Sequence, residues 1–182
     1  MLVEHHQLSE QPLVECCGWI NNEHQESLAA ALELGELVAQ LRLDTASVVA
    51  ALVYRLVRSE RVGKAELAAR IGSEATELVF SVAAMATTSL LEMSDSPMLA
   101  KEQQSQVENV KRMLASMIDD VRVAAIKLAE RVLALRHAKT YEPNRRQRIA
   151  QEAASVFAPL ANRLGVWQLK WELEDLSLRY LR

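Results

Sequence analysis

Few side chains in this sequence combine the residue types and the spacing that catalysis requires. The four histidines share no metal-ligand spacing along any one helix: His5, His6, His24 and His137. We interpret His5 and His6 as solvent-exposed, and His137 as a surface residue or a cation at a helix C-terminus. The five glycines are isolated from one another, so the sequence contains no Gly-rich loop that could cradle a phosphate.

Two short charged groups allow a functional and a structural interpretation. Asp119 and Asp120 could hold a hard cation, but an acidic residue at a helix start also caps the helix and meets its dipole. We favour capping. Arg145, Arg146 and Arg148 form a basic run that we interpret as a solvated face, with a phosphate or RNA contact as the alternative.

The composition favours one helical domain. The 182 residues carry a net charge of −3, half are apolar and a quarter are charged, which is typical of a soluble globular protein. Five glycines and four prolines are too few for an all-β fold with many tight turns. The small negative charge argues against a broad nucleic-acid interface.

The chain shows no sign of export or of membrane insertion. The N-terminus has no cationic flank followed by an apolar run, and the longest uncharged stretch, 78–91, is shorter than the ~20 residues that span a bilayer. Cys16 and Cys17 are adjacent, which disfavours an ordinary disulfide, and two thiols cannot complete a zinc site. The sequence therefore predicts a protein of a reducing cytoplasm with no membrane contact.

Apolar residues recur at helical spacing almost everywhere, and no segment alternates as a strand would. Helices are predicted to begin after Asp44 or Thr45, at 63–66, at Ser73 and after Asp119 or Asp120. The stretch 87–106 is predicted to be a loop, with helix resuming over 107–117. The expected fold is an all-α bundle of about eight to ten helices.

Two prolines and a glycine divide the C-terminal part of the chain. Pro143 fits the first turn of a helix, Gly165 fits the end of the helical stretch 145–164, and Pro159 predicts a kink or break within it. A final helix is predicted over 166–180. Because the sequence is still helical in character at Arg182, we expect this chain to be part of a longer polypeptide.

Two long strings carry a family resemblance. They are QVENVKRMLASMIDDVRVAAIKLAERVLALR (106–136) and FAPLANRLGVWQLKWELEDLSLRYL (157–181). Over 25–182 the chain resembles the N-terminal part of the long RelA/SpoT-type alarmone synthetase/hydrolases. The resemblance implies an all-helical, HD-type hydrolase domain, which in active members uses Mn²⁺ to remove pyrophosphate from the ribose 3′ position of (p)ppGpp.

The same resemblance suggests a division of the chain. Residues 1–24 would be an N-terminal segment of uncertain order. Residues 25–163 would be an HD-type pseudo-hydrolase domain, and 164–182 would begin a helical connector to a synthetase domain that is absent here.

The family pattern also implies a set of metal ligands, and most of them are replaced in this sequence. Ala30 stands where active relatives have the first histidine. The His-Asp pair corresponds to Tyr54 and Arg55, and the Glu-Asp pair that follows corresponds to Arg58 and Ser59.

The last ligand position and a substrate contact have also changed. Glu130 stands at the final aspartate, and Ala134 stands at the asparagine that helps to hold substrate. Alanine offers no donor atom, and a phenol with a pKa near ~10 is a poor ligand for a metal ion at neutral pH. Arg55 is permanently cationic. At ~4 Å and an effective dielectric of ~20, it would repel each unit of metal charge by ~4 kcal/mol.

These replacements predict that no divalent cation binds and that Glu130 pairs with Arg55 or Arg58. The preferred function is a catalytically inactive domain, regulatory or structural, in a GTP pyrophosphokinase of the RelA branch that acts in the stringent response. One alternative is an active metal-dependent (p)ppGpp 3′-pyrophosphohydrolase with altered ligands. Another is a helical protein-interaction module that docks through 87–99. Arg55, Arg58 and Arg131 could also contact a nucleotide, although ion pairs are the more ordinary use of arginine.

The resemblance implies partners and cofactors as well. This chain is expected to need no cofactor, whereas the parent synthetase would use Mg²⁺. The expected partners are the adjoining synthetase domain of the same polypeptide and, through regions absent here, the ribosome and tRNA. The sequence does not indicate an oligomeric state.

Overall fold

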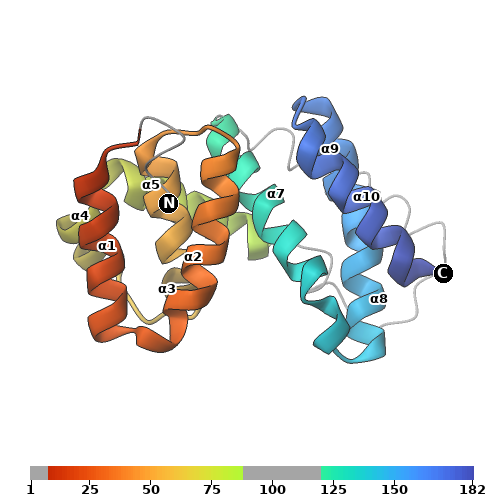
Figure 1. Ribbon diagram of the computed structural model, residues 1–182, viewed down its shortest axis with the longest axis horizontal. Coiled ribbons are helices and arrows are strands. Elements are labelled where there is room, and N and C mark those ends of the chain that lie inside the picture. The colour runs from red at the N-terminus through yellow and green to blue at the C-terminus, as the bar shows by residue number, and fades with distance from the viewer. Residues whose placement is uncertain (1–7, 88–119) are drawn as a thin grey trace. The chain divides into compact units, whose positions relative to one another are not determined.

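The computed structural model describes residues 8–87 and 120–182, which are helical with short connections and contain no strand (Figure 1). This confirms the predicted all-α class. The helices are α1 (Glu10–Glu23), α2 (Gln25–Gln40), α3 (Thr45–Arg58), α4 (Lys64–Ile71), α5 (Ser73–Thr87), α7 (Val121–Arg136), α8 (Pro143–Glu152), α9 (Ala158–Arg163) and α10 (Trp167–Leu181). A 3₁₀ turn, η2 (Ala138–Thr140), follows α7, and a π-helical turn, η3 (Ala153–Phe157), joins α8 to α9.

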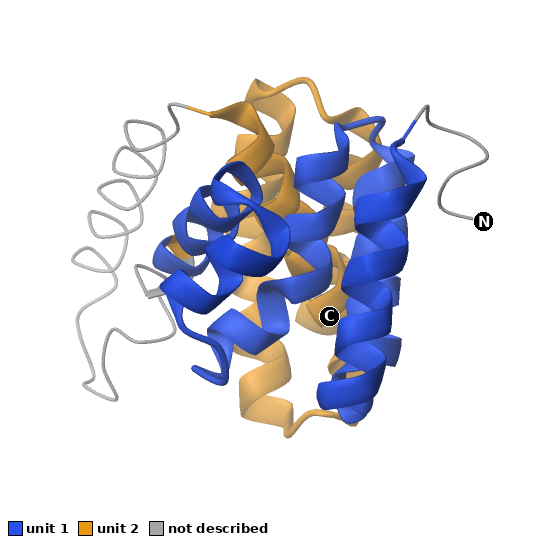
Figure 2. Ribbon diagram, turned by 90° about the vertical axis from the view of Figure 1, so that its left-hand side faces the viewer, with its two compact units in different colours: residues 1–84 blue, residues 85–182 orange. Residues whose placement is uncertain are grey.

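The chain forms two compact units, shown in different colours in Figure 2: Met1–Ala84 is unit 1 and Met85–Arg182 is unit 2. The segment 1–24, of uncertain order from the sequence, contains α1, which packs on α2 and α3. The domain division predicted at residues 24 and 163 stays a prediction. The predicted helix at 107–117 and the cap at Asp119 lie outside the described residues, as does the loop at 87–106 beyond Thr87.

The predicted helix starts are confirmed, and three helix starts have a clear local cause. Asp44 accepts a hydrogen bond from the backbone N–H of Ser47 at 2.9 Å and caps α3. Asp120 accepts one from the backbone N–H of Arg122 at 2.9 Å and caps α7. Pro143 occupies the first position of α8, where its missing N–H costs nothing.

The predicted break before Pro159 takes the form of the π-helical turn η3. Pro159 lies in the first turn of α9, directly after this turn. Proline has no N–H to donate, and in a regular α-helix its ring collides with a carbonyl of the preceding turn. The wider π-helical turn avoids this collision. Gly165 ends the stretch with a φ of 71° that favours glycine, as predicted from the sequence.

Helix α3 is the centre of unit 1. Its buried residues run from Ser47 to Tyr54 and include Leu56 and Val57, and α2 packs closely along it. Gly35 on α2 makes this approach possible, because a Cβ at this position would lie 2.7 Å from Cδ2 and 3.3 Å from Cγ of Leu52. Leu52 is fully buried and has little room to move aside.

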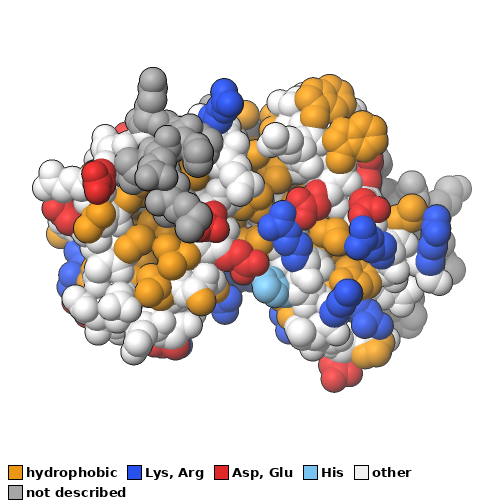
Figure 3. Space-filling view, in the orientation of Figure 1, with side chains coloured by type: hydrophobic (Ala, Val, Ile, Leu, Met, Phe, Trp, Pro, Cys, Tyr) orange, Lys and Arg blue, Asp and Glu red, His pale blue; other side chains and the backbone are white. Residues whose placement is uncertain are grey.

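Helix α10 closes unit 2. It packs on α7, α8 and α9 through a buried face that contains Leu169 and Leu173. Trp167, Trp171 and Leu178 are exposed on the same helix, and Figure 3 shows hydrophobic side chains gathered over the end of unit 2 where α9 and α10 lie. Helix α10 therefore has large apolar side chains that the packing within unit 2 leaves exposed.

None of the helices within residues 8–87 and 120–182 has both the length and the hydropathy that a bilayer-spanning segment requires.

A matched pair of glycine substitutions tests the α2–α3 contact. Gly35→Ala gains helix propensity but forces a methyl group against Leu52, so we expect a net loss of about 1–2 kcal/mol in the free energy of unfolding. Gly18→Ala, on the exposed side of α1 with no atom within 4 Å of the added Cβ, should instead gain up to about 1 kcal/mol. Urea unfolding of both variants measures the difference, and equal changes would contradict this packing.

Candidate functional site

The positions implied by the family pattern are divided between the two units. Unit 1 carries one of them on α2, three on α3 and one at the C-cap of α3: Ala30, Tyr54, Arg55, Arg58 and Ser59. Unit 2 carries Glu130 and Ala134 on α7.

In unit 1, Tyr54 and Arg55 are neighbours in sequence but lie on different faces of α3. Tyr54 continues the buried face of α3 and is only 4% exposed, whereas Arg55 and Arg58 are exposed in the last turn. Half-buried Ala30 on α2 contributes a methyl group and no ligand atom. The side chains at these unit 1 positions therefore supply two guanidinium cations and no carboxylate or imidazole.

The C-terminus of α3 folds into a Schellman motif. The N–H of Glu60 donates to the carbonyl of Val57 and that of Arg61 to the carbonyl of Leu56, both at 3.0 Å. Glu60 has a φ of 55°, in the left-handed region that favours glycine. The hydroxyl of Ser59 donates to the carbonyl of Arg55 at 2.8 Å. These bonds hold the backbone of Arg61 close to the last turn of the helix.

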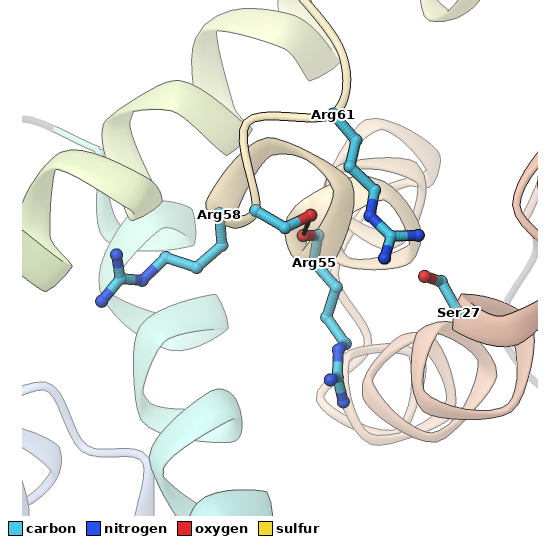
Figure 4. Close-up of a pocket in the computed structure, with 5 residues that line it drawn as sticks. Ser27, Arg55, Arg58 and Arg61 are labelled. Carbon is cyan, nitrogen blue, oxygen red and sulfur yellow. Dashed lines mark hydrogen bonds between the residues drawn. The ribbon is translucent and has the colours of Figure 1, made fainter.

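A cavity of about 190 Å³ lies at this end of α3 (Figure 4). The residues that line it are Ser27, Arg55, Arg58, Ser59 and Arg61. Ser27 lies in the first turn of α2, and Arg61 forms an ion pair with Glu26 from the same turn. Sequence analysis missed Ser27 and Arg61, because no local pattern shows that the start of α2 returns to the end of α3.

In unit 2, Glu130 lies in a buried ionic network. The ammonium group of Lys127, which has no exposed surface, is 2.8 Å from Oε2 of Glu130. Arg131 donates from Nε to Oε2 at 2.8 Å and from Nη2 to Oε1 at 2.9 Å, so both carboxylate oxygens are engaged. Arg131 also donates to Oε2 of Glu152, at the end of α8, at 3.2 Å.

The network sets the protonation of its members. Burial alone would raise the pKa of Glu130, but the charges of Arg131 and Lys127 and their hydrogen bonds outweigh it and lower this pKa to about 2. Burial also lowers the pKa of Lys127, and Glu130 opposes that shift. Glu130 is thus a carboxylate whose charge is already matched by two cations of its own helix.

The structure gives Glu130 two partners on α7, Lys127 and Arg131. Its predicted pairing with Arg55 or Arg58, which belong to the other unit, stays a prediction. Ala134 lies one turn after Glu130 and is half-buried, without a polar side-chain atom. The sequence contained a signal for this network in the i, i+3 spacing of Lys127 and Glu130. Among the described residues, no group of three or more His, Cys, Asp or Glu side chains could hold a metal ion.

The other residues considered from the sequence have local roles. His137 is the C-cap of α7, as predicted. Arg145 lies over the ring of Tyr141, 4.4 Å from its centroid, and Arg146 lies over Tyr180 at 5.8 Å. Arg148 is exposed. Cys16 is buried and Cys17 is half-buried on α1, and both are free thiols. His24 packs against the ring of Trp19. His5 and His6 lie outside the described residues.

Replacing Glu130 tests the buried network. Glu130→Gln leaves two cations without their anion, and we expect a loss of about 3 kcal/mol in unfolding free energy at neutral pH. Because the pKa of Glu130 rises from about 2 in the folded state to about 4.5 on unfolding, its stabilisation is complete above about pH 4.5 and is lost towards pH 2. The difference between variant and unmodified chain should therefore shrink over that interval in urea unfolding.

The control for this measurement is Glu174→Gln on α10. Glu174 pairs with Lys170 on the protein surface, so the same substitution should cost less than about 1 kcal/mol. Equal losses at Glu130 and Glu174, or a Glu130 effect that does not change between pH 5 and 2, would show that the network does not stabilise unit 2.

Comparison with known proteins agrees with this fold. A profile of the HD domain family matches residues 14–167. The GTP pyrophosphokinase of Escherichia coli is 39% identical over 150 residues, which cover 82% of this chain and 20% of that protein. The GTP pyrophosphokinase of Photobacterium angustum is 42% identical over 150 residues, or 81% of this chain and 20% of that protein.

A further relative has a different name. A Synechocystis protein described as a probable guanosine-3′,5′-bis(diphosphate) 3′-pyrophosphohydrolase is 34% identical over 154 residues, which cover 85% of this chain and 19% of that protein. The chain thus spans about a fifth of the length of these curated relatives. From the family profile and these identities together, the chain belongs to the HD domain family and is the HD domain of a RelA/SpoT-type protein.

Proposed function

We propose that this HD domain does not hydrolyse (p)ppGpp and is a regulatory or structural part of a GTP pyrophosphokinase of the stringent response. The observation that carries the proposal is the side chain at position 55. The family pattern has a metal-binding aspartate there, whereas this chain has the exposed, permanently charged Arg55 in the last turn of α3. GTP pyrophosphokinases of two bacteria are among its relatives.

The side chains at the remaining positions of the family pattern do not offset the positive charge of Arg55. Mn²⁺ is held in proteins by imidazole and carboxylate groups, but the unit 1 positions offer a methyl group at Ala30 and a buried phenol at Tyr54. The carboxylate of Glu130 already carries hydrogen bonds from Lys127 and Arg131 on both oxygens. A divalent cation would have to displace these partners, so the donor set does not fit Mn²⁺.

The second candidate function is an active (p)ppGpp 3′-pyrophosphohydrolase with altered ligands. It is favoured by one observation, the name of the Synechocystis relative, a probable 3′-pyrophosphohydrolase. The two functions differ in their requirement for Mn²⁺ and are separated by a direct assay.

The wider context is also part of the proposal. Since the GTP pyrophosphokinases that match are about five times longer than the matched region, we propose that an adjoining synthetase domain is the principal partner. That domain would use Mg²⁺, and other regions of the polypeptide would contact the ribosome and tRNA.

A manganese assay tests the loss of hydrolysis. The 182-residue chain should release no pyrophosphate from ppGpp with Mn²⁺, and Mn²⁺ should not raise its melting temperature. Combining Ala30→His, Tyr54→His, Arg55→Asp and Glu130→Asp restores the family's ligand types, so this variant should bind Mn²⁺ and melt at a higher temperature with the metal than without it. Circular dichroism checks that the variant is folded.

Pyrophosphate release by the unmodified chain that depends on Mn²⁺ would overturn the proposal and favour the second candidate. A matched control is Arg148→Asp, which makes the same charge change on the exposed face of α8 and should not create Mn²⁺ binding.

A deletion in the parent polypeptide tests the regulatory or structural role. Removing residues 1–182 should change the rate of alarmone synthesis by the remaining protein, because a restraining or positioning domain is lost. The substitution Arg55→Ala alone should leave hydrolysis at zero. An unchanged rate of synthesis after the deletion, with the remaining protein still folded, would show that this domain does not act on the synthetase.

A further inference from the structure

We propose that the cavity at the C-terminus of α3 is an anion site that binds a diphosphate group through Arg55, Arg61 and Ser27. The inference deepens the proposed function and rests on it, because the proposed site would hold its anion through arginine side chains and without a metal ion. It assigns a ligand chemistry to the position where the family's metal-binding residues have been replaced.

The charge of the cavity wall is the first argument. Three of its five lining residues are arginines and the other two are serines, so no carboxylate lines it among the described residues. Guanidinium groups stay charged at every physiological pH and present a planar fork of donors that matches phosphate oxygens. Such a wall attracts an anion and repels a metal cation.

The direction of the side chains is the second argument. In Figure 4 the guanidinium of Arg61 extends towards Ser27, whereas Arg55 and Arg58 leave the end of α3 in two other directions. All of these residues line the same cavity. Arg61 and the Ser27 hydroxyl therefore form the nearest pair of donors, and Arg55 adds a second guanidinium to the cavity wall.

The local backbone holds these groups in place. The Schellman motif fixes Arg61 directly after the helix that carries Arg55. Ser59 uses its hydroxyl to cap the carbonyl of Arg55, which leaves Ser27 as the hydroxyl donor for a ligand. Ser27 also lies in the first turn of the 16-residue helix α2, where the helix dipole favours negative charge.

The more ordinary use of these arginines is an ion pair or an interaction with the helix C-terminus. Within the described part of unit 1, neither Arg55 nor Arg58 forms an ion pair, and a contact with the helix dipole would contribute only about 0.3–1 kcal/mol. Arg61 pairs with Glu26, but both side chains are largely exposed, and such pairs contribute about 0–1 kcal/mol. A multiply charged phosphate can displace that carboxylate.

The size of the cavity limits the ligand. The volume of about 190 Å³ is smaller than the roughly 300–1,000 Å³ of pockets that enclose whole drug-sized molecules, and it suits a group of the size of a phosphate or diphosphate. If the diphosphate belongs to a nucleotide, its nucleoside part lies outside the cavity.

Isothermal titration of the 182-residue chain in EDTA tests the site with inorganic pyrophosphate, GDP and guanosine. Pyrophosphate and GDP should bind, more weakly as salt is raised, and guanosine should not. Arg55→Ala and Arg61→Ala should each weaken binding about tenfold or more, since each removes a charge-assisted hydrogen bond. Glu26→Gln should tighten it, because it releases Arg61 and removes a negative charge beside the cavity.

The control variant is Arg42→Gln, which removes one exposed positive charge from unit 1 without changing the cavity wall. It should leave the affinity unchanged, and melting temperatures check that all variants are folded. GDP binding more tightly than pyrophosphate would identify a nucleotide as the source of the diphosphate, and equal affinity would identify free pyrophosphate.

Several results would overturn the anion site. These are absence of binding in EDTA, equal loss on Arg42→Gln and Arg55→Ala, or binding of guanosine alone. Failure of the proposed function would be seen separately, as Mn²⁺-dependent hydrolysis of ppGpp in an assay that contains no EDTA.

Discussion

A lysine ammonium with no exposed surface needs an anion beside it, and in unit 2 this anion is Glu130. Lys127 lies in the middle of α7, and the ionised carboxylate of Glu130 balances its charge at 2.8 Å. Arg131 then links Glu130 to Glu152, whose side chain is 3% exposed at the end of α8. These alternating charges connect α7 to α8, and they fix the side chain of Glu130 through partners that are largely buried.

The network gives the carboxylate at position 130 a structural role that needs no metal ion. In the family pattern, the carboxylate of the Lys-Leu-Ala-Asp-Arg string is a metal ligand. Here, Lys127 and Arg131 flank a glutamate that both of them bind. Removing this carboxylate would leave buried cations unmatched, a cost of about 3–5 kcal/mol that is independent of any metal. Alanine at position 30 and arginine at position 55 carry no comparable structural cost, since one is half-buried and the other exposed.

The helical order could be predicted from the sequence because its signals are local. Asp44, Asp120 and Pro143 mark helix starts through bonds or ring geometry within one turn. Contacts between distant segments gave no such signal. The start of α2 meets the end of α3 through Ser27 and Arg61, residues that neither periodicity nor the family pattern marks. The helix α1 was missed for a related reason, since its stability comes from packing on α2 and α3.

The end of α3 is held in a turn that carries backbone strain. Gly165 and Glu60 both adopt a positive φ at a helix C-terminus, but only Gly165 does so without a steric cost. A glutamate there costs about 1–2 kcal/mol, and strain of this kind persists only where surrounding contacts enforce it. The enforced turn places Arg61 beside the last turn of α3, in the wall that also contains Arg55. In the anion site that we propose, a helix end that supplies ligands for a cation in the family pattern would offer arginine and serine donors to an anion in this chain.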